Sequence, residues 1–356
     1  MTSTMPPPGP PALAAQPPPV PAAAPSSPAV LVTGAGGPAG VAVIRRLMAL
    51  GHRVIAVDAD PTAVGCVLAT HGVTVPRADH VRFVDALAGV AAAFGVDALI
   101  PTVAEELVAL SAGADQLARA GVSTWLPDPA CVGISCDKGA FARLMAISGV
   151  PHPATTDTPS GLVEVPGPWI VKPRSGRGSR GLRLLDNRSA VAEALTDDPS
   201  LIAQTRLSGR EFTADVLVAR DGELVTVVPR WREETKAGIS VKGSTFDSSH
   251  VTDLVAGALE AVRLTGPANV QGFVGEDGRA TIVEINPRFS GGLPLTLAAG
   301  ADVVAAYLAG IRDPQLRLPH LWFTPGVRMT RYFSEVFTAE DGRAVADPSA
   351  VAQVRA

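Results

Sequence analysis

The sequence predicts a mixed architecture in which an α/β unit is followed by an α+β unit, and three observations support this. Residues 29–120 alternate short apolar strands with helical stretches, which is typical of a parallel sheet with crossover helices. From about residue 126, glycine-turn hairpins mix with helices. The hydrophobic fraction is 47% and the charged fraction 18%, so the 356-residue chain can bury the cores of two or three domains.

In the first unit, apolar runs separated by glycine and polar breaks predict each element. Strands are expected at 29–33, 52–57 and 98–100, and helices at 41–50, 86–94 and 105–120. Before this unit, residues 1–28 contain 11 of the 32 prolines. A segment of that composition cannot bury a core, and we expect it to be disordered or partly polyproline II.

In the second unit, Asp137 is a plausible N-cap for a helix at 137–148, since its side chain can accept from the first backbone N–H groups. Further helices are expected at 189–194, 251–264 and 298–310. The expected strands are 169–172, 182–185, 201–207, 211–218, 224–229, 270–274 and 279–285.

The strand and turn at 281–292 are the most informative part of the chain. Strand side chains alternate faces, so Glu284 and Asn286 share one face while Val283 and Ile285 are expected in the core. Two such oxygen donors at a strand end suit a hard cation such as Mg²⁺. Arg288 follows the Asn-Pro turn and can clamp an anion.

Gln271 strengthens the metal-site hypothesis. The turn at 275–278 predicts an antiparallel hairpin, in which Gln271 faces position 282 or 284 and joins the face of Glu284 and Asn286. The alternative is a polar, solvated sheet face without a ligand.

Two glycine-rich loops follow strands. The first, with Gly34, Gly36 and Asp58 at the end of the next strand, fits a relaxed dinucleotide fingerprint. It is equally compatible with a nucleotide-binding shape that carries no NAD. The second, at 173–181, follows Lys172 and can wrap phosphate oxygens through backbone N–H groups and through Ser175 or Ser179, or be an exposed basic turn.

Charge and composition exclude several classes of protein. The net charge of −4 argues against a nucleic-acid-binding surface, and no apolar run is long enough for a membrane span. Three cysteines, Cys66, Cys131 and Cys136, are odd in number and poorly spaced for zinc, which favours a reduced, cytoplasmic setting. The general frequency of symmetric pairs favours a homodimer.

Taken together, the order and spacing of Lys138, Lys172-Pro173 with its glycine loop, Glu211, Gln271 and the Glu284-to-Arg288 motif resemble the ATP-grasp superfamily. The metal trio is similar to that of the carbamoyl-phosphate synthase large-subunit branch and its free-standing relatives. The resemblance implies a Rossmann-like pre-ATP-grasp domain at 29–125, an ATP-grasp domain at 126–333 and a C-terminal tail at 334–356. The first glycine loop would then help to bind a second substrate rather than NAD.

The resemblance also implies a role for each site residue. ATP phosphates would be held by Lys138, Lys172, Ser175, Gly176, Gly178 and Ser179, with Lys172 also near the adenine. Backbone groups of Gln204, Thr205, Arg206 and Leu207 would bind the adenine, and Glu211 the ribose. One or two Mg²⁺ or Mn²⁺ ions would be held by Gln271, Glu284 and Asn286, where Gln271 replaces an acid found in many amide-forming members. Arg288, with Lys172 and with help from Arg230 or Arg232, would stabilise the transferring phosphoryl group.

The function implied is an ATP-dependent carboxylate–amine ligase that releases ADP and phosphate through an acyl phosphate, with a small carboxylate and an amine as its partners. Cations between 230 and 245, namely Arg232, Lys236 and Lys242, suggest an acidic substrate or simply a solvated loop. Two alternatives remain open at this point. One is an NAD(P)-dependent oxidoreductase that uses Gly34, Gly36 and Asp58; the other is a regulatory protein that binds ATP without turnover.

Overall fold

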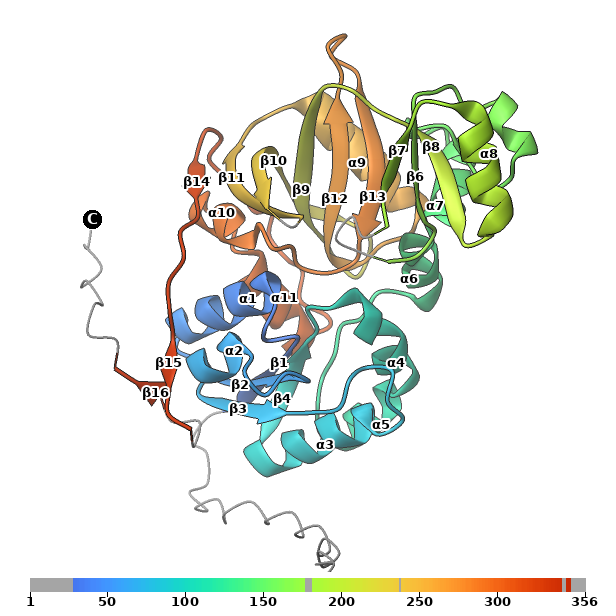
Figure 1. The fold of residues 1–356 in the computed structure, drawn as a ribbon. Helices are drawn as coiled ribbons and strands as arrows, with labels where there is room; N and C mark the ends of the chain where they lie inside the picture. The colour runs from blue at the N-terminus through green and yellow to red at the C-terminus, as the bar shows by residue number, and fades with distance from the viewer. Residues whose placement is uncertain (1–27, 177–180, 237, 341–343, 347–356) are drawn as a thin grey trace, which may run out of the picture.

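The computed structural model describes residues 28–176, 181–236, 238–340 and 344–346. The predictions for the proline-rich segment before residue 28, and for Gly178 and Ser179 in the second glycine loop, lie outside the described residues. Figure 1 shows a parallel sheet flanked by helices in one half of the molecule and two antiparallel sheets in the other half.

The first sheet has the order β3 (His71–Thr74), β2 (Arg53–Asp58), β1 (Ala29–Thr33) and β4 (Val96–Ile100), and all of its pairings are parallel, as predicted. Alternate residues of its strands enter two cores. Val30 and Val32 pack beside α1 (Pro38–Ala49), while Leu31 packs beside α3 (Phe83–Phe94). Helices cover both faces, which explains why these strands are apolar on both sides.

The single helix expected at 105–120 is wrong. The segment forms the 3₁₀ turn η1 (Ala104–Glu106) and two short helices, α4 (Leu107–Ala112) and α5 (Ala114–Arg119), which meet at Gly113. A Cβ at Gly113 would lie 2.5 Å from Val84 of α3. The close approach of α3 therefore requires glycine at the break. A short helix, α2 (Val64–Leu68), and β3 were not predicted.

The largest sheet is antiparallel and forms one wall of the site. Its order is β13 (Ala280–Asn286), β12 (Gly266–Val274), β9 (Arg210–Val218), β10 (Leu224–Lys236), β11 (Ile239–Thr245) and β14 (Arg328–Thr330). Its apolar face packs on α7 (Lys138–Ile147) and α9 (Ser249–Ala261). The predicted N-cap of α7 is confirmed, since the Asp137 carboxylate accepts from the N–H groups of Gly139 and Ala140.

A smaller antiparallel sheet stands beside it, in the order β5 (Thr155–Thr156), β8 (Leu201–Thr205), β6 (Trp169–Pro173) and β7 (Arg183–Leu185). The predicted β6–β7 hairpin around the second glycine loop is confirmed. Helix α8 (Arg188–Asp197) covers the outer face, and the turn η2 (Ser160–Val163) lies nearby.

The expected core position of Val283 is wrong. In the β12–β13 ladder Gln271 pairs with Glu284, but the next pair is Gly272 with Ile282, so Val283 is the extra residue of a bulge. Ile282 takes the core position, while Val283 is half-buried and faces the cavity described below. The prediction for Ile285 is confirmed, because this side chain is buried.

The helix expected at 298–310 is also divided. The chain forms α10 (Leu293–Ala298) and α11 (Val303–Arg312), separated by Gly300 with a φ of +104° and by Asp302, which caps α11. Both helices return to the first sheet and complete one of its two cores. There Tyr307 stacks on Trp125, with ring centroids 5.1 Å apart. The packing of α10 and α11 on the first sheet therefore holds that sheet in place relative to the large one.

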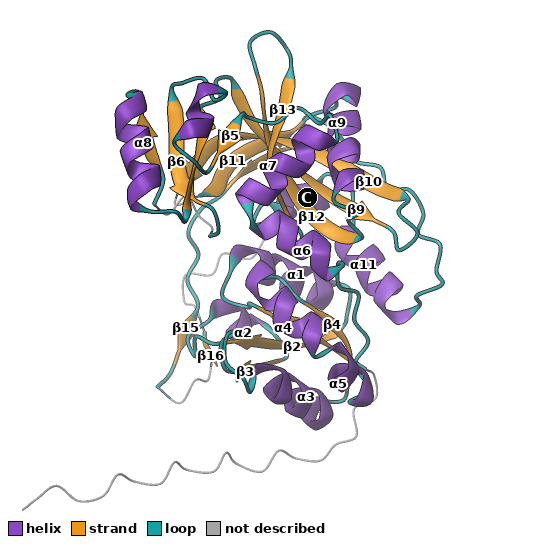
Figure 2. Ribbon diagram, turned by 90° about the vertical axis from the view of Figure 1, so that its right-hand side faces the viewer, coloured by secondary structure: helices purple, strands orange, loops and turns teal. Residues whose placement is uncertain are grey.

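Helix α6 (Pro129–Cys136) connects the two halves and contacts both α4 and β13 (Figure 2). The last strands, β15 (Phe337–Thr338) and β16 (Ala344–Val345), form a small hairpin. Within the described ranges, no helix has the length and apolar character needed to cross a membrane.

Candidate functional site

A cavity of about 1420 Å³ lies where the three main sheets meet. Its walls come from the loops after β1, β2 and β4, from β6 and its glycine loop, and from the polar face of the large sheet. Pockets for one drug-sized molecule usually have volumes of about 300–1,000 Å³. This cavity therefore has room for more than one small ligand.

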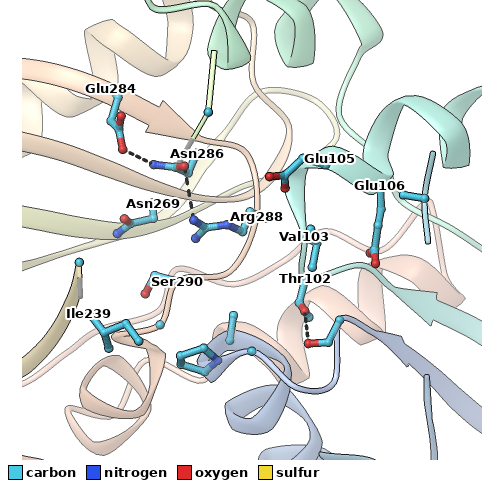
Figure 3. A pocket seen from close by; sticks show the side chains of 18 of the residues that line it. Thr102, Val103, Glu105, Glu106, Ile239, Asn269, Glu284, Asn286, Arg288 and Ser290 are labelled. Carbon is cyan, nitrogen blue, oxygen red and sulfur yellow. Dashed lines mark hydrogen bonds between the residues drawn. The ribbon is translucent and has the colours of Figure 1, made fainter. Parts of the chain in front are cut away.

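The three residues of the predicted metal site lie together on one wall. Gln271 stands opposite Glu284 in the ladder, and Asn286 Nδ2 donates to Glu284 Oε1 at 3.0 Å. Arg288 continues this row, with Nη2 donating to Asn286 Oδ1 at 3.4 Å and Nη1 to the Phe289 carbonyl at 2.9 Å (Figure 3). All four residues line the cavity.

The two predicted lysines reach the cavity from β6 and from the start of α7. Lys138 Nζ donates to the Gly176 carbonyl at 2.9 Å, and Lys172 lies on β6. Burial lowers the pKa of the Lys172 amine from 10.5 to about 8; the nearby Lys138 acts in the same direction, and Glu284 partly opposes it. Of the predicted metal trio, the Glu284 carboxylate therefore interacts electrostatically with the Lys172 amine.

The start of the glycine loop is fastened to the helix that carries Lys138. Arg174 Nε donates to both carboxylate oxygens of Asp137 at 2.8 Å, and the Lys138 N–H donates to the Arg174 carbonyl. Ser175 and Gly176 line the cavity, and their contact with phosphate stays a prediction. The loop therefore leaves β6 from a fixed point.

Glu211 also lines the cavity, where its carboxylate accepts from Arg232 Nη1. The other cations considered for an acidic substrate lie away from the cavity. Lys242 and Lys236 are exposed and pair with Glu234 at 2.8 and 3.9 Å. Their position argues for the alternative of a solvated strand pair at this place.

The segment expected at the adenine does not line the cavity. Gln204 is buried and its Nε2 donates to Thr155 Oγ1 at 2.8 Å, while the N–H groups of Thr205 and Arg206 donate to the carbonyls of Ala154 and Pro168. Leu207 is likewise absent from the cavity wall. The adenine-binding role of residues 204–207 stays a prediction.

Several cavity residues were not predicted. Asn269 shares a face with Gln271 two residues further along β12, so strand alternation could have found it. Glu105 and Glu106 follow β4 at the carboxyl edge of the parallel sheet, where ligands of such sheets bind. The Glu106 carboxylate accepts from Thr33 Oγ1. Ser290 came from the turn after Asn286 and gave no separate signal.

Two family models match the chain. Residues 30–125 match the PylC-like N-terminal domain, and residues 197–329 match the model described as ATP-grasp in the biosynthetic pathway with Ter operon. Residues 197–329 therefore belong to the ATP-grasp superfamily. The two matches cover the parallel sheet and most of the large antiparallel sheet of this ATP-grasp protein.

Individual proteins show the same relationship. The ATP-grasp chain is 33% identical over 98 residues to a D-alanine–D-alanine ligase of Corynebacterium urealyticum, covering 26% of this chain and 27% of the relative. It is 27% identical over 221 residues to the carbamoyl phosphate synthase large chain of Mycobacterium bovis, covering 56% and 20%. The chain spans 19–38% of the length of the curated relatives that it matches.

The fold agrees with solved structures. One is the N5-carboxyaminoimidazole synthetase of Staphylococcus aureus complexed with ADP, with a TM-score of 0.67, 14% identity, and coverage of 83% of this chain and 80% of that chain. At this identity the likeness concerns the fold alone.

The first glycine loop is tied to its own unit. Asp58 Oδ2 accepts from the Gly36 N–H at 2.7 Å, and Oδ1 accepts from the Asp60 N–H at 3.0 Å. In a dinucleotide site the corresponding acid binds the ribose instead. Here the carboxylate braces the loop of the ATP-grasp chain, which gives the fingerprint a structural explanation without NAD.

Proposed function

We propose that this chain is a carboxylate–amine ligase that uses Mg·ATP, forms an acyl phosphate and releases ADP and phosphate. The observation that carries the proposal is the convergence of two groups on one cavity. Lys138 and Lys172 come from the small sheet and α7, whereas Glu284, Asn286 and Arg288 come from the large sheet. Cations on one wall and oxygen donors on the other are what a nucleoside triphosphate with its metal requires.

The donor atoms fit a magnesium ion. Glu284 offers a carboxylate, and Gln271 and Asn286 offer amide oxygens. All three lie on the cavity face of the large sheet. Among the described residues there is no cluster of three His, Cys, Asp or Glu side chains. Since this set carries one formal negative charge, phosphate oxygens would complete the coordination, and the ion would supply neutralisation of phosphate charge.

The protein's own residues position the reactants. Lys138 and Lys172 would hold the phosphates, and Arg288, at the end of the metal row, would face the transferred phosphoryl group. The substrate carboxylate attacks the γ-phosphorus and ADP leaves; the amine then attacks the carbonyl carbon, and phosphate and a proton leave. The glycine loop, fixed at Arg174, would exclude water, which otherwise hydrolyses the acyl phosphate.

The relatives support this assignment by their names. The D-alanine–D-alanine ligase joins two small molecules that each carry a carboxylate and an amine, and the Staphylococcus aureus enzyme was solved with ADP. The volume of about 1420 Å³ accommodates a nucleotide together with a second substrate. We propose a small carboxylate and an amine as substrates, a homodimer as the assembly and the cytoplasm as the location.

The test is ADP release from Mg·ATP against a panel of carboxylates and amines, with mass analysis of the products. We expect ADP and a condensed product with one acid and amine pair. With ¹⁸O in the acid's carboxylate, one ¹⁸O atom should appear in the released phosphate, because the acyl phosphate transfers that oxygen. Phosphate without ¹⁸O would exclude the acyl-phosphate route, and a condensed product other than an amide would exclude an amine as the second substrate.

Glu284→Gln and Glu276→Gln form a matched pair on the β12–β13 hairpin. Glu284 lies in the cavity wall, whereas Glu276 is exposed in the turn. We expect ADP release to be lost only in Glu284→Gln. Normal turnover in Glu284→Gln would exclude the metal assignment.

A further inference from the structure

Arg230 of β10 is a buried cation in the cavity wall. Arg230 is 3% exposed and lines the cavity. Its Nη2 donates to Asp215 Oδ1 at 2.6 Å and to Ser290 Oγ at 3.1 Å. Burial lowers the pKa of Arg230, and Asp215 opposes this. A buried guanidinium stays charged, and the Asp215 counter-ion offsets part of the cost of burying that charge.

Asp215 is the counter-ion of Arg230, and further hydrogen bonds fix its position. Besides Arg230, its carboxylate accepts from Thr296 Oγ1 at 2.6 Å and from Asn269 Nδ2 at 3.2 Å. Asp215 is itself 3% exposed and does not line the cavity. The pair therefore orients one guanidinium edge toward the protein and leaves the rest of the group for another partner.

That other partner is missing from the protein. Among the described residues, Nε of Arg230 is buried without a hydrogen-bond partner, and the bonds of the side chain all leave from Nη2. A buried polar group without a partner costs about 1–3 kcal/mol, more when charged. Nη1 likewise donates to no described residue, and an anionic ligand in the cavity would supply an acceptor for it.

The guanidinium of Arg230 packs closely against Gly292. A Cβ at Gly292 would lie 1.9 Å from Nη1, and Gly292 has an ordinary helical φ of −86°. Glycine is thus required here by the approach of Arg230 rather than by the backbone conformation. The neighbouring Gly291 faces Pro38 at the start of α1, so Arg230 lies at the junction with the first sheet.

Arg230 belongs to a different part of the cavity from the lysines. Lys172 lies on β6 of the small sheet. Arg230 lies on β10 of the large sheet, three strands away from β13, which carries Glu284 and Asn286, and neighbouring strands are about 4.8 Å apart. An anion at Arg230 would therefore be distinct from the phosphates at Lys172.

We propose that Arg230, held by Asp215, binds the carboxylate of the acid substrate, in a subsite separate from the phosphate-binding lysines. This assignment rests on the proposed ligase function. The assignment adds Arg230 and a carboxylate ligand to the proposed ligase function. A charge-assisted hydrogen bond from a buried guanidinium favours a carboxylate over a neutral analogue.

The probe is trifluoroacetate, whose ¹⁹F transverse relaxation reports weak binding to the full chain. We expect its enhancement over that of trifluoroethanol to fall about tenfold in Arg230→Gln, as the loss of a charged hydrogen bond predicts. Arg279→Gln, which removes an exposed arginine in the β12–β13 turn, should keep most of the effect. Equal enhancement in the wild type and Arg230→Gln would overturn the proposal. So would displacement of trifluoroacetate by inorganic phosphate, which would assign the subsite to the nucleotide.

Arg230→Gln leaves Asp215 buried and unpaired, so a double variant, Arg230→Gln with Asp215→Asn, removes both charges and keeps the test valid if the single variant fails to fold. The double variant should also lose trifluoroacetate binding, and retention would overturn the proposal. Trifluoroacetate binding without acid-dependent ADP release would reject the ligase and keep the subsite. Conversely, an unchanged KM for the acid in Arg230→Gln would reject the subsite and keep the ligase.

Discussion

Gln271 and Glu284 stand directly opposite each other in the β12–β13 ladder, immediately before the bulge at Val283. The two side chains therefore face the cavity from neighbouring strands at a fixed separation. An amide thus stands where a second carboxylate would double the formal charge of the predicted metal site.

Gln271→Glu tests this relationship. The added charge should lower the Mg²⁺ concentration for half-maximal ADP release by about tenfold, since ligand charge tunes the affinity of such sites over orders of magnitude. Without metal, two opposed carboxylates destabilise the ladder. Mg²⁺ should therefore raise the thermal midpoint of Gln271→Glu more than that of the wild type. The exposed Gln315→Glu adds the same charge elsewhere and should show neither effect; an identical Mg²⁺ response in Gln271→Glu would remove Gln271 from the metal site.

Lys172 makes ATP binding depend on pH. The pKa of its amine is lowered to about 8, chiefly by burial, and bound phosphate favours the protonated form. The apparent Kd for Mg·ATP should therefore rise about tenfold between pH 7 and 9, with proton uptake on binding near pH 8. Lys172→Met should bind weakly with little pH dependence, while the exposed Lys236→Met should behave as the wild type. A flat profile in the wild type would contradict a phosphate contact by Lys172.

The same shift affects stability with a defined sign. Between pH 8 and 10.5 the folded protein binds fewer protons at Lys172 than the unfolded chain does. The contribution of Lys172 to the free energy of unfolding should therefore increase with pH across this window. Urea unfolding at pH 7.5 and 9.5 measures it as the free energy of unfolding of the wild type minus that of Lys172→Met. A signed value that falls at the higher pH would contradict the shift.

Gly292→Ala should displace Arg230. Because the new methyl group would lie 1.9 Å from Nη1, the guanidinium must move, and a misplacement of about 1 Å can cost about 100-fold in kcat/KM. Gly291→Ala is the matched control, since its Cβ would lie 3.4 Å from Pro38, an ordinary contact. Equal activity of the two variants would show that the position of Arg230 does not matter for turnover.

The sequence alone predicts the parallel sheet and the β12–β13 hairpin because their strands alternate or run apolar in the usual way. It stops β10 at residue 229, although the strand continues to Lys236 and pairs with β11. Arg230 and Arg232 of this extension line the cavity, and all of its residues except Trp231 are polar. Hydrophobic periodicity therefore disappears where the site lies. The extension is visible only through pairing between strands.

The site residues likewise divide into those that a local sequence pattern reveals and those that depend on distant parts of the chain. Glu284, Asn286 and Arg288 occupy every second position of one strand and its turn, so local alternation finds them. The Arg230–Asp215 pair depends on contacts among β9, β10 and α10, and the bulge at Val283 depends on ladder register. Neither feature has a local signal, since each is decided by partners distant in sequence.

Asp215→Asn tests the buried pair through stability. The Arg230 and Asp215 side chains are 4% and 5% exposed, so removal of the anion leaves an uncompensated guanidinium at a cost of about 3 kcal/mol. Urea unfolding should show this loss, and the exposed Asp253→Asn on α9 should change stability little. The double variant with Arg230→Gln should recover part of the loss, because no buried charge remains. If the double variant is instead as unstable as the sum of the two single variants, the pair is not coupled and Asp215 acts through Thr296 and Asn269 alone.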